Sequence, residues 1–100
     1  MSDRIRLLFT DEEISRITEY GTQRKLSVDL HGMKASKAVT FLKNIILLNR
    51  DEFEIHVIHG FNHGTAIKDT IYRDAAIKRR YSLQGINWNP GETILKVKAA

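Results

Sequence analysis

Three short segments of this chain alternate between apolar and polar residues, which is the pattern of a β-strand with one buried face. The segments are Val28–His31, Phe53–Val57 and Thr93–Lys98. A sheet covered on both faces would show continuous apolar runs instead. The alternation predicts a two-layer domain, with helices on one face of a sheet and the other face open or only partly covered. The polar positions that we expect on this open face are Asp29, His31, Glu54, His56, Lys96 and Lys98.

The remaining patterns predict the order of the elements. Strands are expected over residues 25–30 and 53–58, followed by two short strands separated by the turn signal NPGE at 89–92. Apolar residues at helical spacing predict a helix after Gly32 and a second one over residues 65–80. The order β-α-β-α-β-β makes the first two strands parallel neighbours joined by a crossover helix, in an α/β fold of two layers.

The N-terminal segment has a strong helix start. Thr10 and Glu13 form the pattern of a capping box, and Ile14 and Ile17 supply a thin apolar stripe that runs toward a stop at Gly21. We therefore expect residues 1–24 to be a helical extension and residues 25–100 to be a domain that folds without it. The stripe fits packing either on the domain or on a partner.

Composition restricts the class of protein. The chain has 100 residues, enough for one domain with a modest core, and no cysteine, which excludes disulfides and thiolate metal sites. It has no apolar run long enough to span a membrane and no pattern of a signal peptide, so we expect a cytoplasmic protein without a membrane partner. The net charge of +4 favours an anionic partner, although many small proteins are mildly basic.

A histidine–glycine pair ends each of the first two strands, at His31-Gly32 and His59-Gly60. Parallel strands end at the same edge of a sheet, where ligands bind in open α/β folds. Asp29 lies two residues before His31 on the same strand face, and a carboxylate there can orient the imidazole and stabilise its charged form. Glycines and a following helix start suit phosphate, so the residues expected to bind it at this edge are Gly32, Gly60, Asn62, His63, Gly64, Thr65 and Lys68.

The candidate functional residues, and three others that suit nucleic-acid contacts, also have structural explanations. Asp29 is able to cap the turn after its strand, and His63 fits a solvated loop position as well as a phosphate contact. Trp88 suits packing better than base stacking. Arg79 and Arg80 fit nucleic-acid contacts, but cations near a helix end also favour the helix dipole.

At these residues the chain resembles a small MutS-related (Smr) domain over roughly residues 25–98. The resemblance rests on VDLHG, the helix after it, VIHG and the glycine-containing loop before the next helix. It implies a compact β-α-β-α-β-β fold similar to the C-terminal domain of translation initiation factor three. It also implies nucleic-acid binding and, in many members, endonuclease activity.

Two positions depart from the family motifs. Val28 takes the leucine place of the leucine-aspartate-x-histidine motif that ends at His31. Asn62 stands where the H-G-x-G motif has its second glycine, and the next glycine is Gly64, which indicates a rearranged loop. The second departure puts catalytic competence in question more than the fold.

The leading hypothesis from these residues is a nuclease that cleaves RNA or nicks DNA. Asp29 is the only acidic residue within either motif and Glu54 the nearest other candidate, a poor ligand set for Mg²⁺. Two histidines and one carboxylate better suit metal-free acid–base cleavage of RNA, whose 2′-hydroxyl supplies the nucleophile. The catalytic residues would be Asp29, His31 and His59, with no cofactor, while Mg²⁺ stays the alternative.

In this scheme Lys68 and the loop amides would stabilise the charge on the phosphate, and Lys96 and Lys98 would hold the nucleic-acid backbone. Two other functions fit the sequence. One is a non-catalytic nucleic-acid-binding module, which the altered loop favours. The other is a partner-binding domain that docks through its N-terminal helix.

Overall fold

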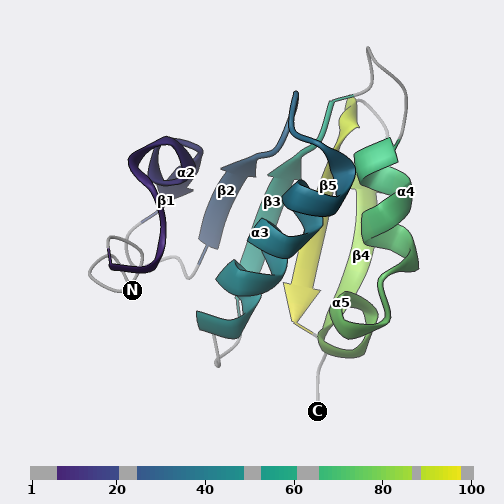
Figure 1. The fold of residues 1–100 in the computed structure, drawn as a ribbon. Helices are drawn as coiled ribbons and strands as arrows, with labels where there is room; N and C mark the ends of the chain where they lie inside the picture. Colours follow the sequence, from purple (N-terminus) through teal and green to yellow (C-terminus); the bar gives the residue numbers. More distant parts are fainter. Residues whose placement is uncertain (1–6, 21–24, 49–52, 61–65, 87–88, 98–100) are drawn as a thin grey trace.

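The computed structural model describes residues 7–20, 25–48, 53–60, 66–86 and 89–97, which form an α+β fold around a five-stranded mixed sheet (Figure 1). The strands lie in the order β1-β2-β3-β5-β4; β2 and β3 are parallel and the other neighbours are antiparallel. Their bounds are β1 Ile17–Glu19, β2 Lys25–Asp29, β3 Glu54–Ile58, β4 Tyr81–Ile86 and β5 Asn89–Val97. The helices are α2 Asp11–Ser15, α3 Ala35–Leu48, α4 Ala66–Arg73 and α5 Ala75–Arg80.

The predicted two layers are confirmed. Helices α3, α4 and α5 cover the same face of the sheet (Figure 1), and the strands turn their apolar positions toward them. Val28 and Val57 are fully buried at paired positions of β2 and β3, and Leu95 is buried on β5. Burying one such side chain stabilises the fold by about 1.5–3 kcal/mol.

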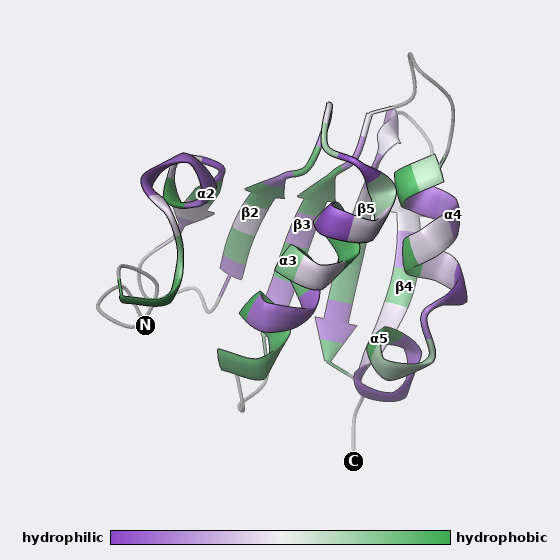
Figure 2. Ribbon diagram, in the orientation of Figure 1, coloured by the Kyte–Doolittle hydropathy of each residue, from purple (hydrophilic) through white to green (hydrophobic). Residues whose placement is uncertain are grey.

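The polar positions of the strands lie on the opposite face, as the alternation predicts. Asp29, Glu54, His56 and Lys96 all alternate with buried neighbours on their strands. His31 lies in the turn that follows β2, and Lys98 lies outside the described residues. The green and purple bands along β2 and β3 in Figure 2 follow this alternation.

The N-terminal segment differs from the expected helix. The capping box at Thr10 is present, but the helix ends at Ser15 with Arg16 as its C-cap. Ile17–Glu19 instead form strand β1, which pairs antiparallel with β2. The pairing satisfies backbone groups at the edge of β2 and half-buries Ile17 against the core, which a continued helix would not do. The ring of Phe9 packs edge-on against that of Phe41 in α3, with centroids 5.3 Å apart.

Two further elements differ from expectation. The expected helix over 65–80 is divided at Asp74, which has extended backbone angles and accepts a hydrogen bond from the amide of Ile77 as the N-cap of α5. The NPGE segment does not separate the last two strands but begins β5 and coincides with a shift of the β4–β5 register. The amide of Gly91 donates to the Asn89 side chain at 3.2 Å, so a local turn forms inside the strand.

Candidate functional site

The two histidine–glycine pairs meet at the carboxyl edge of β2 and β3. The amide of Leu30 donates to the carbonyl of Ile58 at 2.7 Å, which extends the parallel pairing to the end of both strands. Both glycines have left-handed backbones, with φ 79° at Gly32 and 75° at Gly60, which other residues adopt only with strain. A Cβ on Gly60 would lie 3.4 Å from the Cβ of His31. The glycines therefore allow the segments after β2 and β3 to turn away from the sheet while they stay close to each other.

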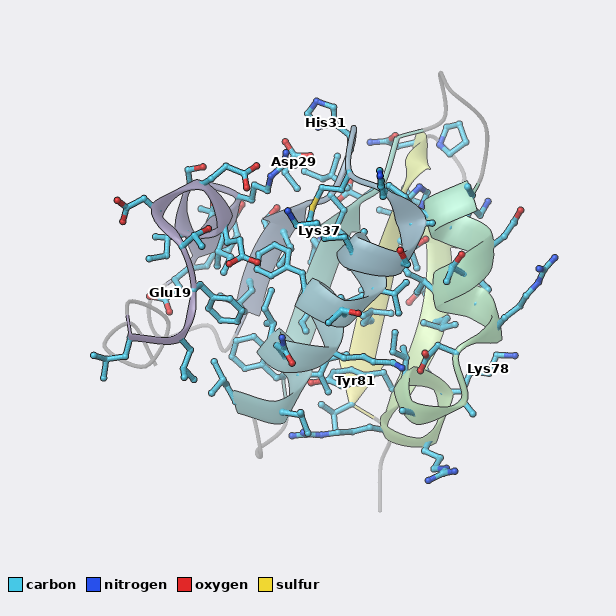
Figure 3. All side chains as sticks on the ribbon, viewed as in Figure 1. Glu19, Asp29, His31, Lys37, Lys78 and Tyr81 are labelled. Atoms are coloured by element: carbon cyan, nitrogen blue, oxygen red, sulfur yellow. The ribbon has the colours of Figure 1, made fainter. Side chains whose placement is uncertain are left out.

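Asp29 and His31 form a side-chain pair at this edge (Figure 3). The Asp29 carboxylate is hydrogen-bonded to Nδ1 of His31 and also accepts the His31 backbone amide at 3.1 Å. Because an ionised carboxylate only accepts hydrogen bonds, Nδ1 carries a proton in this contact. The His31 side chain is 67% exposed. Its Nε2 is thus the nitrogen left to exchange a proton with a ligand.

Arg16 holds the backbone of this pair in place, a contact that the sequence analysis missed. Its Nη1 donates to the carbonyl oxygens of both Asp29 and His31 at 3.1 Å. The carbonyl of Arg16 in turn accepts the Asp29 amide at 2.8 Å, and its Nε pairs with Glu12 at 2.9 Å. The four-residue spacing of Glu12 and Arg16 was visible in the sequence, but their position against β2 depends on the pairing of β1.

His59 points away from the exposed pair, into the helix-covered side of the sheet. Strand alternation continues from the buried Ile55 and Val57 to His59, which is only 5% exposed. The same alternation places Asp29 and His31 on the other side. The parity of the two strands could have shown that the two motif histidines face opposite sides, and the sequence analysis did not use it.

Both ring nitrogens of His59 have partners. Nδ1 lies 2.9 Å from the carbonyl oxygen of Gly60, which can only accept, so Nδ1 is protonated. Nε2 lies 2.9 Å from the hydroxyl of Thr93, and the Tyr72 hydroxyl lies 3.4 Å from the same oxygen. Burial lowers the pKa of His59, and the nearby charge of Lys68 lowers it further. A neutral ring that accepts a hydrogen bond from Thr93 satisfies all of these contacts.

The backbone of the second motif is also engaged. The amides of His59 and Gly60 both donate to the carbonyl of Gly91 at 2.9 Å, so the Gly60 amide is not directed at a ligand. Lys68 lies on the first turn of α4, 5.8 Å from the centre of the Tyr72 ring. The other expected phosphate-binding residues of this loop, and two more named positions, lie outside the described residues: Asn62, His63, Gly64, Thr65, Trp88 and Lys98.

A second polar cluster lies on the open face and includes Glu92, which the sequence analysis had placed only in a turn. Nε2 of His56 lies 2.9 Å from Glu54, and Nδ1 lies 3.4 Å from Glu92. Lys96, which was expected to bind phosphate, lies 3.8 Å from Glu54. The hydrogen bond from His56 lowers the pKa of Glu54, and the charges of Lys96 and Lys25 act in the same direction. This cluster therefore neutralises much of its own charge.

Within the described residues, no group of three or more histidine or acidic side chains is placed to hold a metal ion, and no helix is long and apolar enough to cross a membrane. Comparisons with models of protein families, with curated proteins and with solved structures find no match. The exposed Asp29–His31 pair is therefore the feature from which a function has to be argued.

Proposed function

We propose that this chain is a small nucleic-acid-binding domain of the Smr type that cleaves RNA through Asp29 and His31. The observation that carries the proposal is the geometry of the pair: the carboxylate holds Nδ1, and the exposed ring leaves Nε2 free. An aspartate in this role stabilises the imidazolium that forms when the ring accepts a proton. The order β2-α3-β3-α4-α5-β4-β5 supports the resemblance, with β1 as an addition.

The chemistry needs no group beyond this pair and the substrate. Nε2 of His31 would accept the proton of a ribose 2′-hydroxyl, and the 2′-oxygen would form a bond to the adjacent phosphorus. The bond from phosphorus to the 5′-oxygen would break, and the same imidazolium would return its proton to that oxygen. The products are a 2′,3′-cyclic phosphate and a 5′-hydroxyl. An RNA substrate also fits the expected cytoplasmic location.

His59 has a different role in this proposal from the one expected from the sequence. Its ring would have to leave both hydrogen-bond partners and the interior before it could act on a phosphate. We therefore assign it to the edge as a positioning residue, because it links the end of β3 to β5 through Thr93. The same observation favours the second candidate function, a nucleic-acid-binding module without cleavage, because only one motif histidine is exposed.

The test is cleavage of a labelled single-stranded RNA and of the matching DNA, each with and without EDTA. Asp29→Asn and His31→Ala should each lower RNA cleavage by about two to four orders of magnitude. His56→Gln, a histidine change on the open face away from the edge, is the matched control and should leave the rate unchanged. DNA, which lacks the 2′-hydroxyl, should stay intact.

Three outcomes would contradict this mechanism. Cleavage of DNA with an absolute magnesium requirement would make Asp29 a metal ligand. Equal loss in the His56 control would indicate a general effect on the sheet. Binding of RNA without cleavage by the wild type would leave only the binding module.

A further inference from the structure

The charges of the described residues are divided between the two layers. The helix layer, counted over residues 34–48 and 66–80, contains eight lysines and arginines and only two aspartates. None of the five described strands contains more lysines and arginines than carboxylates. Within the described residues 7–20, the N-terminal segment contains four acidic residues and one basic residue, Arg16. Among the described residues, the excess of positive charge therefore lies in the helix layer.

One of the two aspartates of the helix layer is engaged within the fold, and the other is exposed on α4. Asp74 is largely buried and pairs with Lys43 at 2.6 Å, and it caps α5. Asp69 follows directly after Lys68 at the start of α4. Arg73, Lys78 and Arg79 are exposed, and no carboxylate lies within ion-pair distance of them in the part of the chain that the structure describes.

Arg80, unlike Arg73, Lys78 and Arg79, has its side chain engaged within the fold. Its Nη1 donates to the carbonyl of Ile46 near the end of α3 at 2.7 Å, and its guanidinium lies 5.7 Å from the centre of the Tyr81 ring. Among the three consecutive basic residues at the end of α5, Arg80 therefore has a structural role. Lys78 points away from the sheet (Figure 3), and Arg79 is exposed, so neither has such a role.

We infer that the outer surface of α4 and α5, formed by Lys68, Arg73, Lys78 and Arg79, binds the backbone of a single-stranded nucleic acid. The surface begins near His59, on the helix side of the sheet: Lys68 lies 5.8 Å from the Tyr72 ring, and the hydroxyl of Tyr72 lies 3.4 Å from the Thr93 oxygen that His59 contacts. α4 and α5 contain eight and six residues, about 12 Å and about 9 Å of helix, so their four cations can meet several phosphates of one strand. This surface replaces the open face of Lys96, which was expected to bind phosphate, since Lys96 faces Glu54.

The chemistry of the surface favours a nucleic acid over a membrane. Binding to a lipid surface usually combines cations with exposed apolar side chains that enter the bilayer. The large apolar side chains that are exposed in the described residues are Leu7, Leu8, Tyr20, Leu47 and Ile58, and none of them lies on α4 or α5. A surface of cations without large exposed apolar side chains fits a row of phosphates in water.

The inference rests on the proposed function for the class of ligand, but its test does not need cleavage. The probe is a fluorescein-labelled 12-nucleotide RNA with 2′-O-methyl groups, which cannot form the cyclic product. The variant Lys78→Gln/Arg79→Gln is compared with Lys25→Gln/Lys96→Gln, which removes the same charge from the open face. Affinity is measured by fluorescence anisotropy over a salt titration, and the urea midpoint of each variant checks its folding.

The first variant should reduce the slope of log affinity against log salt by about 1.4, because each phosphate contact of a single strand contributes about 0.7. The control should leave the slope unchanged. An equal change in both variants would mean that net charge and no particular surface is responsible, and a change in the control alone would return binding to the open face. If Lys78→Gln/Arg79→Gln loses binding to phosphatidylserine vesicles while its affinity for RNA is unchanged, the surface binds a membrane instead.

Cleavage is measured on the same proteins with unmodified RNA. If Asp29→Asn abolishes cleavage and keeps the salt slope, both proposals stand. If the wild type cleaves nothing but Lys78→Gln/Arg79→Gln still lowers the slope, the mechanism fails and the binding surface stands.

Discussion

Nη1 of Arg16 lies 3.1 Å from the carbonyl oxygen of His31, so a residue of the N-terminal segment holds the turn that carries the candidate catalytic histidine. The same atom donates to the carbonyl oxygen of Asp29, the other residue of the pair. The segment expected to be a dispensable extension is thus part of the candidate site.

Replacing Arg16 should disturb the site more than the fold. Arg16→Gln should cost about 1 kcal/mol in free energy of unfolding and lower kcat for RNA cleavage about tenfold, because a misplaced reacting group loses its orientation. Arg16→Lys keeps the charge and should recover part of kcat. Thr18→Ala, an exposed change on the same segment, is the control. An NMR spectrum in which the His31 ring signals are identical in Arg16→Gln and the wild type would refute a positioning role.

Removing residues 1–24 should destabilise the domain, contrary to the expectation from the sequence. The truncation deletes β1, exposes the backbone edge of β2 and uncovers the Phe41 ring that contacts Phe9. We expect a lower urea midpoint and concentration-dependent association. A truncated protein that stays monomeric with an unchanged midpoint would show that β1 contributes nothing to stability.

His59 should make the protein less stable as the pH falls below about 6.5. Its pKa in the folded chain is lowered, so the unfolded chain binds a proton first, and stability decreases from its unfolded pKa down to its folded pKa. The loss is at most about 1.4 kcal/mol per pH unit. Urea unfolding at pH 7.5 and pH 5.5 should give a smaller difference for His59→Gln than for the wild type. Equal differences would mean that the pKa of His59 is the same in the folded and the unfolded chain.

The two motif glycines should respond differently in activity but alike in stability. Alanine at either position must adopt a left-handed backbone, which costs about 1–2 kcal/mol. Only the new methyl of Gly60→Ala would contact His31, whereas Gly32→Ala adds a methyl with nothing within 4 Å. Cleavage relative to the folded fraction should therefore fall more for Gly60→Ala. The reverse order would argue against close packing of the two motifs.

Asp74→Ala should test the division between α4 and α5. The change removes the N-cap of α5 and the partner of Lys43, and should cost about 1–2 kcal/mol in unfolding free energy near neutral pH. Burial raises the pKa of Asp74, but its hydrogen bonds from Lys43 and Ile77 outweigh burial and the net pKa is lowered. The difference between wild type and variant should therefore shrink as the pH falls below 3.8, which acid titration of the urea midpoint would detect.

The sequence by itself determined the strand faces, the parallel pairing of β2 and β3 and the capping box, because these depend on periods of a few residues. Asp29 and His31 share a face for the same reason. The alternation of β3 likewise predicts that His59 lies on the buried face. The expected helix through Ile17 was wrong because a thin apolar stripe fits both a helix turn and a short edge strand.

Only the tertiary structure decided that Ile17–Glu19 form an edge strand and not a helix turn. The unpaired edge of β2, with which they pair, is created by residues elsewhere in the chain. It also brought Arg16 to His31, Thr93 to His59 and Glu92 to His56, contacts that span 15, 34 and 36 positions. Such contacts leave no local period, because each depends on strand order and register, which are set by packing of the whole core.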